Sequence, residues 1–493
     1  MTIAASIQLN DEQQQAVVTA IDVAHDAGHM ALIGPAGTGK TTTIRAIAHR
    51  IAREFPGQGV LLLAPTHKAK RQFSAAALPR GSDTWTVARF CRTRVTTWRD
   101  QDRFSRSSNN LPTIAQLQGR FAFVIVDESS MVAHEAASQI VDICETAGIG
   151  VMFAGDPYQL GPIGERQIVD DGEPFDGLRD AGPESAQAPE FVDAPVAARL
   201  HTVMRHGGSI LEFATGLRDN WATIHGFPSE PVKDPESEIV VSSRFGRDYL
   251  QHFWQEFLKH RADSAALYAA APRALCYMNG TVDRITTELR RRIYGEDAMK
   301  QWQIGEIIMF PDYTKASSGA IYSSSDAIVT DSKIVEIPEM TMTVNYQTQA
   351  RQADKRIELS FSGIFQQLTV HLVNPDGTVD KYRERIVMTP ICGDENPRRI
   401  CAEASKQLQS RRLPSDHPAW LWLKDIRETY LTRVNSAYAM TVHKSQGSTF
   451  NHVYVSRDLL MTDDREKRNS LLYVAATRAS KTLTFSATGT HAF

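Results

Sequence analysis

The sequence predicts an α/β protein made of two domains, each built on a parallel β-sheet and each carrying an insertion. Apolar runs recur along the first half of the chain, each followed by a polar cluster and a helical pattern, at residues 59–63, 121–126 and 151–154. Continuous apolar strands that alternate with helices indicate a parallel sheet covered on both faces. From about residue 301 to 425 the pattern changes to short strands, and α/β alternation resumes near Ala437.

These changes in pattern divide the chain. We expect the first α/β domain over residues 1–90 and 119–195, and the second over residues 196–300 and 426–493. Residues 91–118, which are rich in Arg, Thr and Ser and show no obvious helix, interrupt the first domain. Residues 301–425 predict a small antiparallel insertion in the second domain, with short strands at 306–310, 327–330, 334–337 and 367–373. The polar stretch 170–195 predicts an exposed connection.

Composition argues against several classes of protein. The 493 residues carry a formal net charge of -3, so a non-specific polycation is not expected and a nucleic-acid surface would be a local groove. The five cysteines show no C-x-x-C spacing, which argues against a zinc site or a disulfide framework. Neither a secretory leader nor an apolar run of about 20 residues is visible, and we expect a cytoplasmic protein with no membrane partner.

The segment Gly34–Thr41 fits the phosphate-binding pattern G-x-x-x-x-G-K-[ST]. An apolar run at residues 30–33 precedes it, and helical spacing follows over residues 42–51. In this context backbone amides and the helix N-terminus hold phosphate oxygens. Lys40 would reach the β- and γ-phosphates, and Thr41 would hold Mg²⁺. A Gly-rich turn before a structural helix is the alternative, and the motif by itself does not say what the energy is used for.

Two further polar clusters follow predicted strands, at the sheet edge where ligands of parallel sheets bind. Asp127 and Glu128 match a Mg²⁺-holding carboxylate and a carboxylate that orients the attacking water. Capping of the next helix is the alternative. Gln159, within Gly155–Pro162, could sense the γ-phosphate, although the same segment could be an ordinary Asp-Pro turn.

Three other features point to the same site. Gln13 could complete a capping box with Asn10, or read the adenine edge with its amide. Arg205 and Arg478, both assigned to the second domain, are candidate arginine fingers, with solvated surface groups as the alternative. Residues 439–448 combine small polar groups with a histidine, a lysine and a glycine, a mixture that suits a loop contacting both nucleotide and a nucleic-acid backbone.

In their order along the chain, these clusters resemble the motifs of the superfamily 1 helicases. The resemblance is closest to the 5′→3′ branch of Dda-type helicases found in T-even bacteriophages and related to RecD, and it covers nearly the whole chain. The motifs that carry it are GPAGTGKTTT (34–43), APTHKAK (64–70), VDESSM (126–131), GDPYQLGPI (155–163), LHTVMR (200–205), LCYMNGTV (275–282), TVHKSQGST (441–449) and LLYVAATRA (471–479).

The resemblance implies two RecA-like P-loop NTPase domains with ATP and Mg²⁺ between them. The catalytic residues that it implies are Lys40, Asp127, Glu128, Gln159, Arg205 and Arg478, and the Mg²⁺ ligands are Thr41 and Asp127. The implied nucleotide-binding set is Gln13, Gly34, Pro35, Ala36, Gly37, Thr38, Gly39, Lys40, Thr41, Thr42 and Gly447.

The resemblance also implies a track for single-stranded DNA, formed by Pro65, Thr66, His67, Asn279, Thr441 and His443. Further candidate DNA contacts are Thr84, Trp85, Trp98 and Phe104. Residues 91–118 would be the β-hairpin pin that splits the duplex, where aromatic rings among arginines suit stacked bases and phosphates. A solvated basic loop is the alternative. Residues 301–425 would be an SH3-like tower. Where the family often has Thr-x-His, this chain has Thr84-Trp85-Thr86, and Trp85 could stack on a base.

The implied function is an ATP-dependent DNA helicase that translocates 5′→3′ on single-stranded DNA and unwinds forked or tailed duplexes, in phage DNA replication, recombination or repair. The implied setting is a monomer in the host cytoplasm, with a single-strand-binding protein or replisome components as further partners. The alternatives are a translocase that mainly displaces bound proteins, a nucleotide-gated DNA clamp and an RNA helicase.

Overall fold

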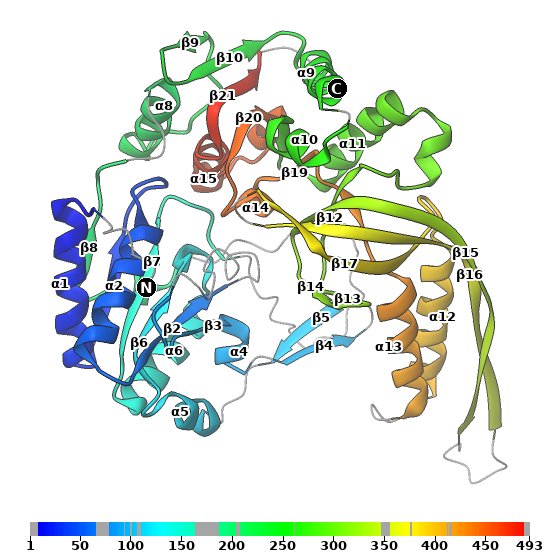
Figure 1. Cartoon of the computed structure of the whole chain (residues 1–493), viewed down its shortest axis with the longest axis horizontal. Coiled ribbons are helices and arrows are strands. Elements are labelled where there is room, and N and C mark those ends of the chain that lie inside the picture. Colours follow the sequence, from blue (N-terminus) through cyan, green and yellow to red (C-terminus); the bar gives the residue numbers. More distant parts are fainter. Residues whose placement is uncertain are drawn as a thin grey trace.

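The computed structural model describes residues 8–65, 78–92, 94–98, 101–105, 110–162, 187–203, 208–260, 262–346, 355–374, 377–411, 413 and 417–487. They form two α/β domains with a β-rich arm to one side (Figure 1). The predicted fold class, two parallel-sheet domains with a β-rich insertion in the second, is confirmed. Among the helices of these residues, none combines the length and apolarity needed to cross a membrane.

The first domain is built on a six-stranded sheet in the order β3-β2-β6-β7-β1-β8, in which every pairing is parallel. Its strands are β1 (His29–Ile33), β2 (Gly59–Ala64), β3 (Asp83–Thr86), β6 (Phe121–Val126), β7 (Gly150–Gly155) and β8 (Ala197–Arg199). The accompanying helices are α1 (Asp11–His25), α2 (Lys40–Glu54), α4 (Val87–Phe90), α5 (Leu111–Leu117), α6 (His134–Ala147) and α7 (Pro189–Val192).

Alternate residues of these strands pack on opposite faces of the sheet. Along β2, Leu61 and Leu63 join a core that includes residues of α6, whereas Val60 and Leu62 join a core that includes residues of α1 and α2. Because both faces are covered, the strands are continuous apolar runs rather than alternating ones. The predicted helical spacing of residues 42–51 is also explained, since Ile44, Ile47, Ala48 and Ile51 are the buried face of α2.

The second domain contains a six-stranded sheet in the order β19-β11-β20-β21-β10-β9, parallel except for the short edge strand β9. Its strands are β9 (Val232–Lys233), β10 (Glu238–Ser242), β11 (Arg273–Cys276), β19 (Ala439–Thr441), β20 (Phe450–Val455) and β21 (Ala479–Ser486). Its helices are α8 (Gly208–Asp219), α9 (Phe245–Lys259), α10 (Ser264–Ala270), α11 (Asn279–Tyr294), α14 (Val442–Ser445) and α15 (Arg465–Ala476).

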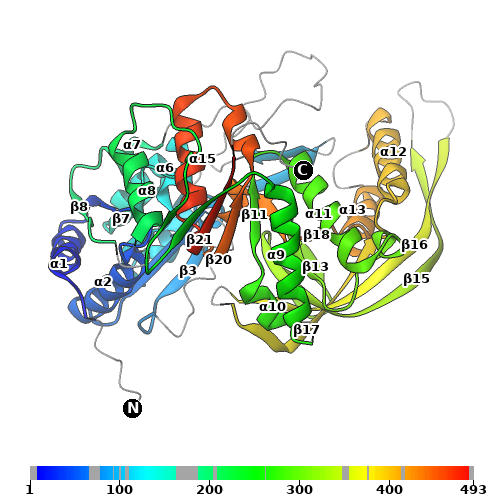
Figure 2. The same ribbon diagram turned by 90° about the horizontal axis from the view of Figure 1, so that it is seen from above.

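The β-rich arm, called the tower below, is an antiparallel sheet in the order β17-β16-β15-β12-β18 with two helices packed on it. Its strands are β12 (Ile307–Phe310), β15 (Ser325–Tyr346), β16 (Lys355–Val373), β17 (Val379–Pro390) and β18 (Asn435–Ser436), with a small hairpin of β13 (Thr314–Ala316) and β14 (Gly319–Ile321). The helices are α12 (Asn396–Ser410) and α13 (Pro418–Tyr430). Seen from above, α12 lies at the end of the molecule opposite α1 (Figure 2).

The tower differs from its prediction in two ways. The expected short strands at 327–330, 334–337 and 367–373 are parts of β15 and β16, which run for 22 and 19 residues. The predicted border at residue 425 falls inside α13, and β18 still pairs with β12 of the same sheet. Neither α12 nor α13 was expected, although Cys401, Ala404 and Leu408 repeat at helical spacing and are buried.

Two connecting segments also contain helices that were not expected. Residues 91–118 include the antiparallel hairpin of β4 (Arg94–Trp98) and β5 (Gln101–Ser105), but α5 follows within the same segment. The predicted exposed connection at 170–195 contains α7, whose Phe191 is fully buried in the core of the first domain. The sequence did not predict these short helices because so few residues cannot display a helical repeat of apolar positions.

A buried ion pair joins the tower to the second domain. The Arg290 guanidinium on α11 donates to Glu306 at 2.6 Å, next to the start of β12, and both side chains are buried. Arg290 also lies 4.3 Å from the Trp302 ring and donates to the Gln301 carbonyl at 2.7 Å. Removing one partner of such a pair leaves an uncompensated buried charge, which costs about 3–5 kcal/mol. The base of the tower is therefore firmly fixed to α11.

Candidate nucleotide site

The loop between β1 and α2 has the geometry of an anion site. Gly37 and Gly39 adopt positive φ values of 88° and 81°, a conformation that other residues rarely take. A Cβ on Gly34 would lie 2.7 Å from the Thr38 hydroxyl and 3.2 Å from the Leu200 carbonyl, so only glycine fits there. The loop leads directly into the N-terminus of α2, where backbone amides and the helix dipole favour negative charge.

The Lys40 ammonium folds back over this loop. It donates to the carbonyl oxygens of Gly34 at 2.7 Å and Pro35 at 3.0 Å. Its charge is thereby held beside the loop amides. A bound phosphate can compete for the same ammonium, because a charge-assisted bond to phosphate is stronger than a bond to a neutral carbonyl.

Gln13 supports the loop from behind. Its backbone N–H and side chain complete the capping box with Asn10, at 2.9 and 3.1 Å, so the capping alternative is realised. Its side-chain amide also donates to the Thr38 carbonyl at 3.2 Å and lies where a Cβ on Gly39 would collide with it. Gln13 is buried against the loop and does not line the pocket described below, so its adenine-reading role stays a prediction.

Asp127 and Glu128 stand at the end of β6, beside the loop. Asp127 is only 4% exposed, and burial together with the charge of Glu128 raises its pKa to about 7. Glu128 takes a positive φ of 51°, a conformation that costs a non-glycine residue about 1–2 kcal/mol. It precedes the short 3₁₀ helix Ser129–Met131 but makes no side-chain cap bond to it. The capping alternative therefore does not account for this pair.

Gln159 follows β7 and reaches the same place. The turn that carries it is held by Asp156, which accepts from the Tyr158 N–H at 3.1 Å and whose carbonyl accepts from the Gln159 N–H at 3.1 Å. The alternative of an Asp-Pro turn is therefore realised, and the same segment also places Gln159 at the pocket. Among the described residues, the buried side-chain oxygen of Gln159 has no hydrogen-bond partner, and Gln159 lines the pocket, where a ligand can supply the missing donor.

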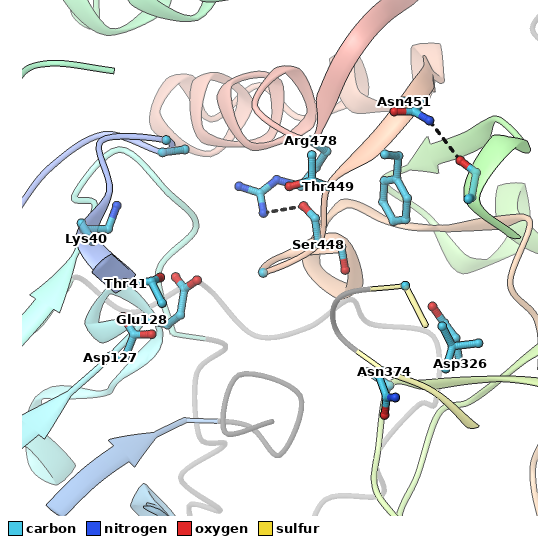
Figure 3. Close-up of a pocket in the computed structure, with 18 of the residues that line it drawn as sticks. Lys40, Thr41, Asp127, Glu128, Asp326, Asn374, Ser448, Thr449, Asn451 and Arg478 are labelled. Carbon is cyan, nitrogen blue, oxygen red and sulfur yellow. Dashed lines mark hydrogen bonds between the residues drawn. The ribbon is translucent and has the colours of Figure 1, made fainter. Parts of the chain in front are cut away.

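Arg478 approaches from the second domain. It lies just beyond α15 and is 3% exposed, and its guanidinium donates to the carbonyls of Val474 at 3.2 Å and Ser448 at 3.1 Å. Figure 3 shows it across the pocket from Lys40, Thr41, Asp127 and Glu128. Gly447, with a positive φ of 73°, lies next to Ser448 on the same wall. Arg205 lies outside the described residues.

One pocket of about 620 Å³ joins the two α/β domains at this place. Eleven of the predicted nucleotide-site residues line it: Ala36, Gly37, Gly39, Lys40, Thr41, Thr42, Asp127, Glu128, Gln159, Gly447 and Arg478. Sequence reasoning missed further lining residues, among them Arg45, Tyr268, Asp326, Asn374 and Phe450. No local motif marks these positions, because they come from elements that meet only in the folded chain.

Tyr473 is another residue that the sequence analysis did not identify, and it connects the first domain to the second. Its hydroxyl donates to the Asp156 carboxylate at 2.7 Å and accepts from the Ala36 N–H at 3.3 Å. Burial, reinforced by the Asp156 charge, holds the pKa of this phenol well above its usual range. Its position in the last motif, five residues before Arg478, was the sequence feature that could have identified it.

Trp85 was expected to stack on DNA, and the structure contradicts that expectation. The ring is 1% exposed and packs among Phe90 and Phe121, with ring centroids at 6.5 and 6.2 Å. Its indole N–H donates to Asp83 at 2.9 Å. Trp85 is a core residue, because β3 turns this position inward against the sheet. Neighbouring Thr84 is partly exposed, and Thr86 caps α4 by accepting from the Arg89 N–H at 3.2 Å.

The remaining predicted DNA contacts of the second domain gather at one sheet edge. Strands β11 and β19 are parallel neighbours with Cys276 opposite Thr441, so Asn279 and His443 follow the same ends of adjacent strands. Asn279 is exposed and His443 is partly buried. The loop before Asn279 is held by Asp458, whose carboxylate accepts from two consecutive backbone N–H groups at 3.0 and 2.9 Å.

In the first domain, Pro65 lies partly exposed at the end of β2, while Thr66 and His67 lie outside the described residues. Trp98 and Phe104 belong to the β4–β5 hairpin, where Trp98 pairs with Gln101 and Phe104 with Val95. Their contacts with DNA stay predictions.

Comparison with known proteins agrees with this geometry. The model of an AAA domain matches residues 8–187, and the model of a UvrD-like helicase C-terminal domain matches residues 436–486. The ATP-dependent DNA helicase dda of Enterobacteria phage T4 is 24% identical over 462 residues, which covers 91% of this chain and 92% of that protein. An uncharacterized protein of Acanthamoeba polyphaga mimivirus is 23% identical over 501 residues, 92% of this chain and 94% of its own.

Among solved structures, the Pif1 helicase from Candida albicans aligns with a TM-score of 0.48 at 16% identity, over 97% of this chain and 94% of that one. The Pif1 helicase from Bacteroides in complex with ADP-AlF3 and ssDNA aligns with a TM-score of 0.47 at 16% identity, over 97% and 92% of the two chains.

Proposed function

We propose a DNA-stimulated motor cycle for this chain, which belongs to the superfamily 1 helicases and is an ATP-dependent DNA helicase of the Dda type. In this proposal it translocates 5′→3′ on single-stranded DNA and unwinds forked or tailed duplexes. The proposed setting is replication, recombination or repair of phage or viral DNA in the host cytoplasm. It acts there as a monomer, together with a single-strand-binding protein or replisome components.

The observation that carries the proposal is the pocket with walls from two domains. Lys40 and the phosphate loop lie on one wall, and Arg478 lies on the other. A triphosphate bound by both walls favours the closed cleft, because its negative charge attracts a cation from each side. Loss of the γ-phosphate weakens that attraction and lets the cleft open. Hydrolysis thereby becomes a relative movement of the two domains.

Five polar residues of the pocket have separate roles in this cycle. Thr41 and Asp127 would hold Mg²⁺, which supplies charge neutralisation at the phosphates. A hydroxyl beside a single buried carboxylate suits this ion, which usually keeps waters and phosphate oxygens as its other ligands. Glu128 orients the attacking water, Gln159 accepts or donates at the γ-phosphate side, and Arg478 stabilises charge on the transferred phosphoryl group.

The DNA track runs, in this proposal, along the sheet edges that carry Pro65 in the first domain and Asn279, Thr441 and His443 in the second. Because these residues belong to different domains, their spacing changes when the nucleotide cleft closes. The β4–β5 hairpin splits the duplex ahead of this track. The tower, fixed to α11 through Arg290 and Glu306, supports it.

The test compares unwinding of two duplexes that carry either a 5′ or a 3′ single-stranded tail. We expect ATP-dependent unwinding of the 5′-tailed duplex only. Unwinding from the 3′ tail would reverse the proposed direction, and displacement of a bound protein without unwinding would indicate the translocase instead.

Lys40→Ala is the matched variant for this assay. It should abolish DNA-stimulated ATP hydrolysis, because the loop loses the cation that faces the phosphates, while much of the DNA binding remains. Turnover like that of the unsubstituted protein would refute the role given to the loop.

A further inference from the structure

The nucleotide pocket extends past the phosphate-binding residues to the base of the tower. Ser324, Ser325 and Asp326, at the start of β15, line it together with Asn374, which directly follows β16. Figure 3 shows Asp326 and Asn374 on the side of the pocket away from Lys40. The insertion therefore forms part of the wall of the cleft between the two α/β domains.

In the part of the chain that the structure describes, one carboxylate oxygen of Asp326 has no hydrogen-bond donor. One carboxylate oxygen accepts from the Tyr268 hydroxyl at 2.7 Å, which fixes the orientation of the group. The other oxygen is buried and has no hydrogen-bond partner among the described residues, and the residue as a whole is 8% exposed. A buried acceptor without a donor is costly, and native structures keep few of them unless a ligand completes the bond.

The surroundings of Asp326 suit the nucleoside half of a nucleotide rather than its phosphates. The cationic lining residues are Lys40 and Arg45 of α2 and Arg478 in the turn after α15, and none of them belongs to the tower. Tyr268, which bonds to Asp326, lines the same pocket, as do the Phe450 ring and the amides of Asn374 and Asn451. Arg273 lies against both rings, at 4.9 and 5.5 Å from their centroids. A carboxylate there repels phosphate and attracts a donor.

We propose that Asp326 accepts a hydrogen bond from the nucleoside of the bound nucleotide, so that the tower contributes a specificity residue to the nucleotide site. The donor is either a ribose hydroxyl or the exocyclic amine of the base. This inference rests on the proposed function, since it concerns the same pocket. It adds a residue that lies outside every motif of the two α/β domains.

The same contact would connect the bound nucleotide to the tower. Asp326 belongs to β15, which continues for 22 residues along the tower. Asp326 also pairs with Met309 of β12, the strand that begins one residue after Glu306. A nucleotide that engages Asp326 is thus bonded directly to the strand that forms the tower.

The test measures KM and kcat for ATP hydrolysis by the unsubstituted protein, Asp326→Ala and Asp326→Asn. Asparagine keeps an oxygen for the Tyr268 hydroxyl but places an amide donor where the free acceptor was. We expect both variants to raise KM for ATP roughly tenfold, the usual effect of a bond to a charged group, with kcat little changed. Asp331→Ala is the matched control, since Asp331 is an exposed carboxylate on the same strand, and it should leave both constants unchanged.

Three analogues identify the donor: 2′-deoxy-ATP, 3′-deoxy-ATP and the triphosphate of purine riboside, which lacks the exocyclic amine. The unsubstituted protein should bind one of them more weakly than ATP, and Asp326→Ala should bind that analogue and ATP equally. If the variants and the unsubstituted protein rank all four nucleotides identically, the proposal is overturned. Thermal unfolding of each variant checks that the fold is intact.

Equilibrium competition against a fluorescent ATP analogue repeats the comparison without hydrolysis. A failure of the proposed motor would appear as absent DNA stimulation in the unsubstituted protein. A failure of the Asp326 inference would appear as unchanged nucleotide ranking, so the two are separable.

Discussion

The Tyr473 hydroxyl donates a hydrogen bond of 2.7 Å to the Asp156 carboxylate. The two residues are 317 positions apart in the chain, and their bond joins the second domain to the first. The same hydroxyl accepts from the Ala36 N–H within the phosphate loop. Tyr473 therefore contacts both the loop that holds the nucleotide and the turn that carries Gln159. In the proposed cycle, these bonds would couple a change at the γ-phosphate to movement of α15.

Tyr473→Phe should weaken this coupling while keeping the buried ring. We expect DNA-stimulated kcat to fall severalfold and the free energy of unfolding to drop by about 1–2 kcal/mol, because the Asp156 oxygen is left without its donor. Steady-state ATPase assays with and without single-stranded DNA, together with urea denaturation, provide the measurement. Tyr158→Phe is the control, since that ring lies 6.2 Å from Tyr473 and leaves the Asp156 bond in place. An unchanged kcat in Tyr473→Phe would remove this residue from the cycle.

Arg478→Lys and Arg478→Ala should separate binding from hydrolysis. Hydrolysis should fall by about 10³-fold or more, because the charge that develops on the phosphoryl group loses its bidentate partner. Nucleotide affinity should change only a few fold, as measured by fluorescent ADP binding beside single-turnover hydrolysis. Arg457→Ala is the matched control, a second-domain arginine that bonds the Ala487 carbonyl and does not line the pocket. Survival of hydrolysis in both Arg478 variants would show that the charge comes from elsewhere.

Asp127 should make the nucleotide-free protein less stable as the pH rises. Its folded pKa of about 7 lies above the unfolded value near 3.9, so its contribution is fully present below pH ~4 and is lost as the pH rises through 7. Asp127→Asn stays neutral and should gain roughly 2–4 kcal/mol relative to the unsubstituted protein between pH 5 and 8. Urea denaturation in the presence of EDTA at the two ends of this pH range measures the difference. Asp142→Asn, which removes an exposed carboxylate on α6, is the control. A parallel pH dependence in both proteins would contradict the raised pKa.

Trp85→Ala should destabilise the first domain rather than weaken DNA binding. Removing a fully buried indole from its contacts with Phe90 and Phe121 costs about 3–5 kcal/mol, whereas the affinity for single-stranded DNA should be unchanged once folding is accounted for. Thermal unfolding and fluorescence anisotropy of labelled single-stranded DNA measure the two quantities. Trp85→Phe provides a milder variant that still folds. Weaker DNA binding at unchanged stability would restore the stacking role.

Local patterns predicted much of the fold and half of the site. The phosphate loop, the Asp127–Glu128 pair and the apolar strands are each made of neighbouring residues. Their local structure therefore depends mainly on residues of the same segment. The long tower strands were harder to predict. Their length depends on α12 and α13, which cover one side of β15 and β16 and bury Val344, Leu359 and Phe361.

Trp85 shows where local reasoning fails. An aromatic residue in a short edge strand can face bases or a core, and only the packing against Phe90 and Phe121 decides which. The sequence by itself determined that a triphosphate binds between strand ends, because that chemistry needs adjacent glycines, a lysine and a threonine. Only the tertiary structure decided what completes the pocket. Asp326 lines it from β15 and Arg478 from the turn after α15, and their distances to the loop depend on long-range packing that no short segment encodes.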